Sequence, residues 1–316
     1  MTTLADRPLA TETSQGIGGR LYRFLRSIPT WVLWVLVILW SLPTFGLFVN
    51  SFRGRDSQRT TGWWTFEGPW TLDNYEAILS AGPTGGLWQA FLNTLAIAIP
   101  ATVIPIAIAT FAAYAFAWID FPGREWLFIG TVALLAIPAQ TSLIPLLQLY
   151  SGGAHLTIPG IEKTVTIFPD LGLAGEHVAV WLTHTGFALP FAIFLIHNYV
   201  SQLPKDVFES ARIDGADHFA IFWRLVLPLS VPVLAAFAIF QFLWTYNDYL
   251  IALTMIGANG VNLPMTVRIA SLAGEFGRLV HLLTAGAFVS MAMPLAVFFA
   301  LQRFFVRGIL AGSVKG

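Results

Sequence analysis

Among the long apolar stretches of this 316-residue chain, a single acidic side chain stands out as a candidate for chemistry, Asp248. A carboxylate within a membrane span is costly and is often functional. Three roles are open for it: a proton relay in an ion-coupled secondary transporter or channel, a contact that lines a solute path, or a hydrogen-bonded structural residue near the end of its span. Polarity and helical proximity make Gln241, Trp244, Asn247 and Asp248 the candidates for lining a substrate path.

Other arrangements that carry chemistry are missing from the sequence. The chain has no cysteine, which excludes disulfides, thiolate metal sites and cysteine nucleophiles. His184 and His197 lack the i, i+4 spacing and the acidic neighbours of a metal site, so buried, hydrogen-bonded histidines are expected instead. No Gly-Lys dipeptide occurs, so the chain has no phosphate-binding P-loop, and the glycines at 16–19 are interpreted as linker. Nothing supports a membrane-embedded hydrolase, and neither a cofactor nor a metal is expected on this chain.

The elements that must position the candidate residues are membrane helices. The chain is 56% hydrophobic and only 11% charged, whereas soluble domains carry about 25% charged residues. Its formal net charge of zero gives no general attraction to nucleic acid. A bilayer core needs about 20 apolar residues per helix, and six stretches meet that need: 31–50, 88–119, 126–150, 178–200, 225–258 and 279–301. The predicted fold is therefore all-α and integral to the membrane, with a transmembrane domain over 31–302 between an N-terminal segment, 1–30, and a C-terminal tail, 303–316.

The basic residues predict the orientation of these spans. An even number of spans places both termini on one side, and if that side is the cytoplasm, eleven of the 17 Lys and Arg residues lie inside and six outside. The inside set is Arg7, Arg20, Arg23, Arg26, Arg124, Lys205, Arg212, Arg224, Arg303, Arg307 and Lys315, and the outside set is Arg53, Arg55, Arg59, Lys163, Arg268 and Arg278. The positive-inside rule favours this arrangement. The first stretch is longer than a signal peptide's apolar core and no Ala-x-Ala site follows it, which predicts an uncleaved first helix.

The segment 201–224 differs from an ordinary connector because it has a helical pattern of its own. Pro204 suits a helix start, and Val207, Phe208 and Ala211 form an apolar face. After Gly215 a second short apolar face is predicted over 216–223. Two short amphipathic helices joined at a glycine could rest on lipid headgroups or dock on another protein. Their mixed charge favours docking, because membrane-surface helices are usually basic.

A motif in this segment resembles the signature loop of binding-protein-dependent ABC importer permeases. Glu209-Ser210-Ala211, three residues, Gly215, nine residues and Leu225-Val-Leu-Pro228 match Glu-Ala-Ala-x3-Gly-x9-Ile-x-Leu-Pro, with serine for alanine and leucine for isoleucine as the departures. Further stretches resemble the carbohydrate branch, in particular the maltose-importer G-type subunit. They are Thr71-Leu-Asp-Asn-Tyr75, Asn93-Thr94, Ala113-Tyr-Ala-Phe116, Phe121-Pro-Gly123, Trp244-Thr-Tyr-Asn-Asp248 and the ending 302–316. The insertion 151–177 and the stretch 179–186 are similar to the α-glucoside group.

The resemblance implies a division of labour between this chain and others. It implies that the loop over 204–223 is the coupling helix, lying between spans four and five in a cleft of a cytoplasmic ATP-binding cassette dimer, which binds ATP and Mg²⁺. A second, non-identical permease would complete the path, and an extracytoplasmic sugar-binding protein would deliver the sugar. The residues that carry over to the coupling site are Glu209, Ser210, Ala211, Asp214, Gly215, Leu227 and Pro228.

Simpler readings stand beside these implied roles. Glu209 would pair with a basic residue of the ATPase, or else lie on a solvated helix face. Gly215 would allow a turn that a Cβ would obstruct, or else be an ordinary loop glycine. Trp63, Trp64 and Trp70 could stack on sugar or touch the binding protein, or else be an interfacial aromatic belt.

Overall fold

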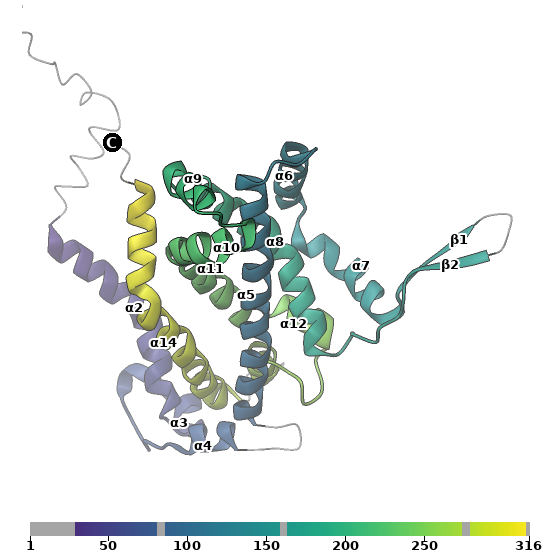
Figure 1. Cartoon of the computed structure of the whole chain (residues 1–316). Coiled ribbons are helices and arrows are strands. Elements are labelled where there is room, and N and C mark those ends of the chain that lie inside the picture. The colour runs from purple at the N-terminus through teal and green to yellow at the C-terminus, as the bar shows by residue number, and fades with distance from the viewer. Residues whose placement is uncertain (1–28, 81–85, 159–162, 274–278, 314–316) are drawn as a thin grey trace, which may run out of the picture.

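Helices make up almost all of the described protein, which comprises residues 29–80, 86–158, 163–273 and 279–313 of a computed structural model (Figure 1). The N-terminal segment 1–28, Arg278 and Lys315, which enter the prediction of orientation, lie outside the described residues.

Among the described residues, five helices are long and apolar enough to cross a membrane. They are α2 (Thr30–Ser51), α5 (Leu87–Trp118), α8 (His177–Val200), the continuous run His218–Tyr246, and Val280–Ala300 within α14 (Val280–Ser313). The run His218–Tyr246 comprises α10 (His218–Ile221), a π turn (Phe222–Val226) and α11 (Leu227–Tyr246). A bent pair of helices, α6 and α7, makes a sixth span if the two are taken together. The prediction of membrane helices is confirmed, and the number of spans is five or six.

The third predicted span is not one straight helix. Its two halves, α6 (Arg124–Ala133) with the short 3-10 turn Leu134–Ala136, and α7 (Ala139–Gly152), meet at an angle of 100°. Pro138 causes the break, because the residue before a proline is pushed out of the helical region. Ile137 has an extended backbone, and Pro138 itself caps the start of α7.

The fifth predicted span is also interrupted. The sequence predicts one span over 225–258, but α11 ends at Tyr246 and α12 (Leu250–Ile256) is a separate element. The carboxylate of Asp248 accepts the backbone N–H groups of Ile251 and Ala252 and so begins the new helix. The helix also begins earlier than predicted, at His218, so the second amphipathic face over 216–223 is part of the spanning run and not a helix of its own.

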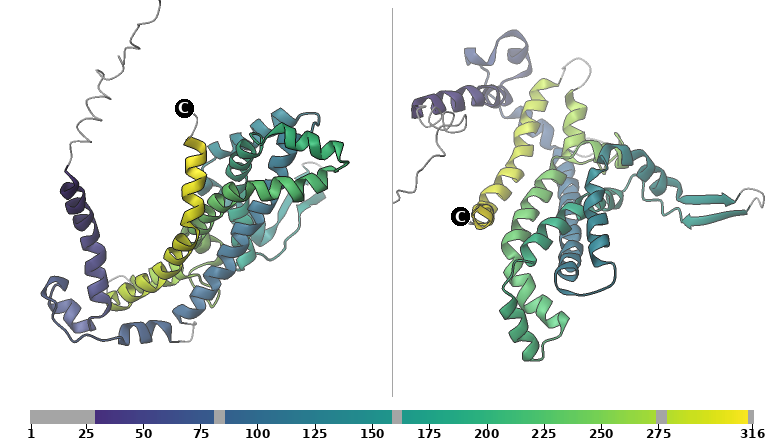
Figure 2. Two further views of the ribbon diagram at one scale, coloured as in Figure 1. Left: turned by 60° about the vertical axis from the view of Figure 1, so that its left-hand side comes forward. Right: turned by 90° about the horizontal axis from the view of Figure 1, so that it is seen from above.

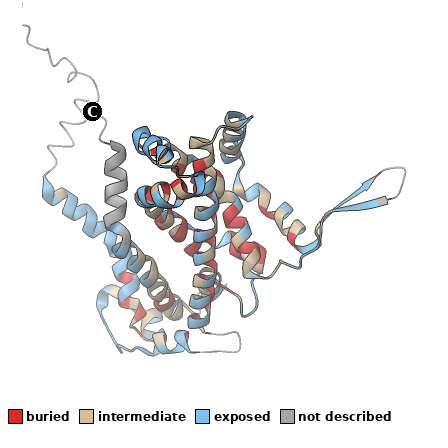
Figure 3. Ribbon diagram, in the orientation of Figure 1, coloured by how far each residue is buried: buried red, intermediate tan, exposed pale blue. Residues whose placement is uncertain are grey.

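The core lies where α5 packs against α8 and α11, with α14 on the other side of α11. Buried residues concentrate along these facing surfaces, and small side chains such as Ala98, Ala109 and Ala192 bring the backbones close together (Figure 3). By contrast, α2 diverges from the bundle and is largely exposed (Figure 2). Exposed apolar helix surface is expected where lipid or another subunit covers it.

Short helices lie at the two ends of the bundle. One end carries α9 (Lys205–Ile213), α10 and α6, and the opposite end carries α3 (Arg55–Thr60) and α4 (Asp73–Leu79) (Figure 1). The short 3-10 turn Trp63–Thr65 and helix α13 (Met265–Ala273) complete the helical elements. A two-stranded antiparallel hairpin, β1 (Ala154–Ile158) and β2 (Lys163–Phe168), extends away from the helices.

At the α3–α4 end, Arg53 is fully buried and holds the connecting segment in place. Its guanidinium donates to the carbonyls of Glu67, Ser57 and Thr61 and to the side chains of Asn50 and Thr61. Trp64 and Trp70 of the same segment are exposed.

Candidate functional site

Helix α9 is attached to the bundle by one deeply buried side chain, Phe208. Its ring is 1% exposed and stacks on the indole of Trp118, with ring centroids 3.8 Å apart and planes 10° from parallel. Trp118 is the last residue of α5, and its Nε1 donates to the carbonyl of Val200 at the end of α8, 3.1 Å away. One aromatic stack therefore joins α9 to two spans.

Gly215 ends α9 through its backbone conformation. Its φ is +81°, in the left-handed region. The Gly215 N–H donates to the Arg212 carbonyl at 3.0 Å, and the Ala216 N–H to the Ala211 carbonyl at 2.9 Å. This is the Schellman pattern, in which a left-handed residue closes the last helical carbonyls. This positive φ confirms the prediction of a turn that disfavours a Cβ. A Cβ on Gly215 would meet no atom within 4 Å, so the requirement for glycine comes from φ and not from a neighbouring group.

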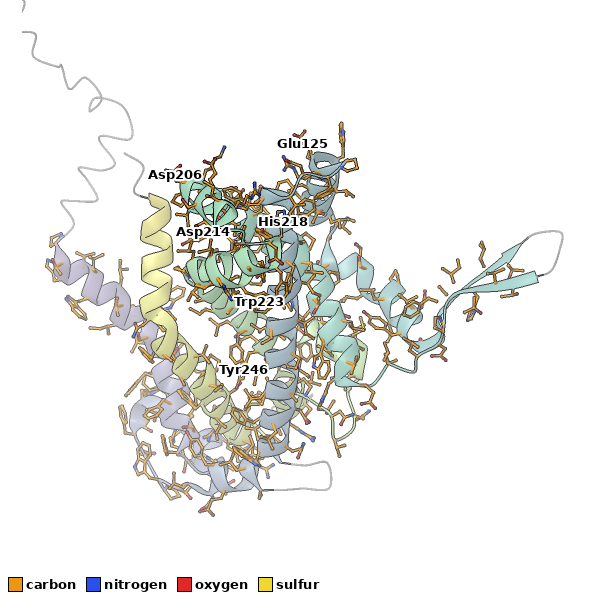
Figure 4. All side chains as sticks on the ribbon, in the orientation of Figure 1. Glu125, Asp206, Asp214, His218, Trp223 and Tyr246 are labelled. Carbon is orange, nitrogen blue, oxygen red and sulfur yellow. The ribbon has the colours of Figure 1, made fainter. Side chains whose placement is uncertain are left out.

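Helix α10 begins at His218, soon after Gly215, and is hydrogen-bonded to α5. The carboxylate of Asp217 caps α10 by accepting the Ala220 N–H at 2.7 Å. The hydroxyl of Tyr114 lies 2.8 Å from Nδ1 of His218, the first residue of α10. Figure 4 shows His218, Asp206 and Asp214 together at this end of the molecule. The α9–α10 turn is thus held by Phe208 on one side and by His218 on the other.

The outer side of this turn is an exposed, partly apolar surface. Ile213 is 86% and Phe219 68% exposed, and Trp223 stands beside Phe219 with ring centroids 5.9 Å apart. A cavity of about 520 Å³ lies between the two helices, lined in part by Ala211, Asp214 and Gly215. We call Glu209, Ile213, Phe219 and Trp223, with this cavity, the docking surface. Among the described residues, the exposed Glu209 carboxylate has no hydrogen bond or ion pair, so it is free to meet a charge on another chain.

The structure separates the predicted coupling residues into two groups. Glu209, Ala211, Asp214 and Gly215 lie at or beside the docking surface, and Ser210 is exposed on α9 with its hydroxyl on the Asp206 carbonyl. Leu227 and Pro228 instead begin α11. Proline lacks an N–H and crowds the carbonyl four residues before it. The wider π turn over Phe222–Val226 lies directly before Pro228 and lets the helix continue through it.

Asp248 acts as a helix-starting residue. Its Oδ1 accepts the Ile251 N–H at 3.3 Å and its Oδ2 the Ala252 N–H at 2.9 Å. The residue lies beyond the end of α11, outside the candidate span His218–Tyr246. These contacts favour the structural role among the three that the sequence left open.

The other three residues predicted to line a substrate path lie in different environments. Gln241 is buried and donates to the Ala101 carbonyl of α5 at 3.0 Å, so it packs inside the bundle. Asn247 is exposed and donates back to the Leu243 carbonyl of its own helix. Trp244 lines a cavity that has a volume of about 600 Å³ and lies between the α6–α7 break and α8.

His184 of α8 completes this region. Its ring is fully buried, contacts Trp244 edge to face at 5.2 Å between centroids, and places Nε2 3.6 Å from Oδ2 of Asp248. The expected burial is correct for His184. The expected hydrogen bonds are wrong, because within the described residues neither ring nitrogen has a hydrogen-bond partner. Among all the described residues, no group of three or more His, Cys, Asp or Glu side chains could hold a metal ion.

Sequence reasoning missed three contributors to these sites: Tyr114, Trp118 and the cavity beside Trp244. The aromatic end of α5 was visible as a cluster, but no spacing rule connects residues about 90 positions apart. The cavity depends on the break at Pro138, which the apolar pattern of 126–150 conceals.

Comparison with known proteins agrees with this geometry. Residues 107–311 match the family described as the binding-protein-dependent transport system inner membrane component. The osmoprotective compounds uptake permease protein GgtD of Synechocystis sp. is 49% identical over 94% of this chain and 95% of its own length. The alpha-glucoside transport system permease protein AglG of Rhizobium meliloti is 52% identical over 78% of this chain and 60% of its own length.

A solved structure shares the fold. A bacterial ABC transporter involved in the import of the acidic polysaccharide alginate contains a chain that superposes with a TM-score of 0.69, at 19% identity, over 92% of this chain and 98% of that one.

Proposed function

Because the chain belongs to the binding-protein-dependent transport system inner membrane components, we propose that it is one membrane-spanning subunit of an ATP-driven sugar importer. The observation that carries the proposal is the docking surface on the α9–α10 turn, rigidly joined to the spans yet exposed on its outer side. A helix pair that is anchored inside and apolar outside is suited to transmit the movement of a partner. The family is an inner membrane component, and the chain lies in that membrane.

The partner at the docking surface is a cytoplasmic ATP-binding cassette dimer. This chain has no P-loop, so ATP and Mg²⁺ bind on the partner and the energy enters through the turn. Glu209 pairs there with a basic side chain, while Ile213 and Phe219 enter an apolar cleft. This chain itself makes and breaks no bonds. Its docking surface faces the cytoplasm, as do both termini.

A second, non-identical permease completes the path, and an extracytoplasmic binding protein delivers the solute at the α3–α4 end. The largely exposed surface of α2 supports a subunit or lipid neighbour along that helix. The substrate class is an α-glucoside or maltose-type sugar. Support comes from the 52% identity to a permease named for alpha-glucoside transport and from the similarity to GgtD, named for osmoprotective compounds.

The ion-coupled alternative would need Asp248 to exchange protons during transport. Its two oxygens already accept backbone N–H groups at the start of α12, which is a structural role that needs no proton exchange. The alternative also assigns no purpose to the docking surface.

Uptake into proteoliposomes separates the two mechanisms. The chain, co-expressed with its second permease and ATPase, is reconstituted with the binding protein, and radiolabelled maltose, trehalose and sucrose are offered in turn. We expect uptake of at least one sugar that requires internal ATP and survives a protonophore. Uptake that needs no ATP and collapses with the proton gradient would overturn the proposal and favour proton-coupled transport through Asp248.

A further inference from the structure

The cavity beside Trp244 has no role in the coupling described so far. It is bounded by the α6–α7 break on one side and by Thr183, Gly186 and Phe187 of α8 on the other. A volume of about 600 Å³ falls within the range of small-molecule sites, roughly 300–1,000 Å³. The break at Pro138 creates the space, because a straight helix over 126–150 would pack along α8.

The floor of the cavity includes an exposed aromatic ring. The Trp244 side chain is 43% exposed, and among the described residues its indole N–H has no hydrogen-bond partner. A pyranose ring has an apolar face of C–H groups that lies well on an indole, and hydroxyls around its edge that take hydrogen bonds. An apolar site with a few convergent polar groups is the usual design of a small-ligand pocket.

Unused hydroxyl groups lie in the same cavity. Ser142 and Tyr150 of α7 both line it, and within the described part of the chain neither hydroxyl forms a hydrogen bond. Lipid chains or an apolar helix could not satisfy these groups, and a polar group left unpaired on burial is costly. A molecule that combines an apolar face with hydroxyls would fit both the indole and these groups.

A buried pair holds Trp244 from behind. Asp248 is fixed by the N–H groups that start α12, His184 places Nε2 3.6 Å from its Oδ2, and the His184 ring meets the Trp244 ring at 82°. Edge-to-face contacts between such rings stabilise their relative orientation. Trp244 also lines the cavity, so the ring that His184 contacts is the one that an occupant would meet. The contact with Trp244 also gives a role to the fully buried His184, whose ring nitrogens have no hydrogen-bond partner among the described residues.

We propose that the cavity between α7 and α8 is a sugar subsite of the translocation path, in which Trp244 stacks on a glucosyl ring, Ser142 and Tyr150 bind its hydroxyls, and His184 is the positioning residue of the indole. This rests on the proposed function and deepens it, because it assigns a sugar contact to this subunit.

The test uses the complete reconstituted importer and the maximal rate of ATP-driven uptake of the three disaccharides. Trp244→Ala should lower that rate up to about tenfold, the loss expected for one aromatic contact. The half-saturating sugar concentration should stay within about twofold, because the binding protein captures the sugar. Trp244→Phe should retain most of the rate. Trp126→Ala, at an exposed tryptophan of α6 outside the cavity, is the matched control and should leave uptake unchanged.

His184 is tested by a conservative pair. His184→Phe keeps an aromatic ring beside Trp244 and should retain most of the uptake. His184→Ala should instead reproduce the Trp244→Ala defect, including any change in preference among the three sugars. The proposal is overturned if Trp244→Ala behaves like Trp126→Ala, or if it releases the second permease on purification, which would make the cavity a subunit interface. In both cases sugar uptake by the unaltered complex leaves the proposed function standing. Failure of the unaltered complex to carry any of the sugars removes both proposals.

Discussion

The indole of Trp118 and the phenyl ring of Phe208 lie face to face, with centroids 3.8 Å apart, at the junction of α5 and α9. Trp118 is also hydrogen-bonded to the carbonyl that ends α8. Three elements from separate parts of the chain thus meet at one stack, in which Phe208 is buried and Trp118 half-buried. Rigid attachment of this kind is what a coupling element needs, because a loosely hinged helix would absorb movement instead of transmitting it.

Removing the stack should uncouple the transporter. Truncation of a buried phenylalanine costs about 3–5 kcal/mol in protein cores, so Phe208→Ala should loosen α9 and strongly reduce sugar-stimulated ATP hydrolysis and uptake together. Phe208→Leu fills much of the space and should retain more of both. Phe219→Ala, on the exposed side of the turn, should instead weaken co-purification of the ATPase. Equal behaviour of Phe208→Ala and the unaltered chain would remove the stack from the account.

The effect of a substitution at Gly215 should depend on how readily the new residue adopts a left-handed backbone, and not on the size of its side chain. A left-handed conformation costs a residue with a Cβ about 1–2 kcal/mol, and asparagine pays less than other residues. We expect Gly215→Asn to keep most of the uptake and Gly215→Val to lose it, although a Cβ at this position meets no atom within 4 Å. Membrane insertion, measured by the amount of chain in washed membranes, should be the same for both. Similar loss in the two variants would point to crowding against a partner instead of φ.

Charge reversal at Glu209 should block docking. Glu209→Lys places a cation where a basic partner residue is expected, and breaking an interfacial charge pair weakens binding by more than about tenfold. Co-purification of the ATPase and ATP-driven uptake should both fall. Glu76→Lys reverses an exposed acid at the opposite end of the bundle and serves as the control. If the two reversals have equal effects, Glu209 belongs to a solvated face.

Asp248 should behave as a helix cap. Loss of a capping side chain costs about 0.5–2 kcal/mol, so Asp248→Ala should lower the thermal stability of the purified complex and reduce uptake moderately. Asp248→Asn keeps an acceptor oxygen and should retain more stability. ATP dependence should be unaltered in both variants, and a change to proton-dependent kinetics in Asp248→Asn would revive the ion-coupled mechanism.

Much of the fold follows from the sequence, because apolar stretches of the right length leave few alternatives to membrane helices. The stretches that became α2, α5 and α8 were predicted to within one or two residues. The α9 helix and its stop at Gly215 were also predictable, since proline, glycine and the spacing of Val207 and Phe208 are local signals.

The errors came from single residues acting against a strong apolar pattern. Pro138 breaks the third stretch, although prolines at 100 and 105 are accommodated inside α5. Asp248 starts a new helix in the fifth stretch. The sites were harder still, because Trp118 with Phe208 and Trp244 with His184 are tertiary pairs whose partners no local pattern identifies.

The most direct test of the central claim is a cross-link from the docking surface. Benzoylphenylalanine is placed at position 213, or at position 126 as the control, and is combined with a unique affinity tag elsewhere. Irradiation of native membranes followed by mass spectrometry should join position 213 to a Walker-motif ATPase, and the cross-link should vanish in the Glu209→Lys background. A cross-link from position 213 only to lipid or to this chain, with the transporter otherwise active, would contradict the assignment of the α9–α10 turn as the coupling element.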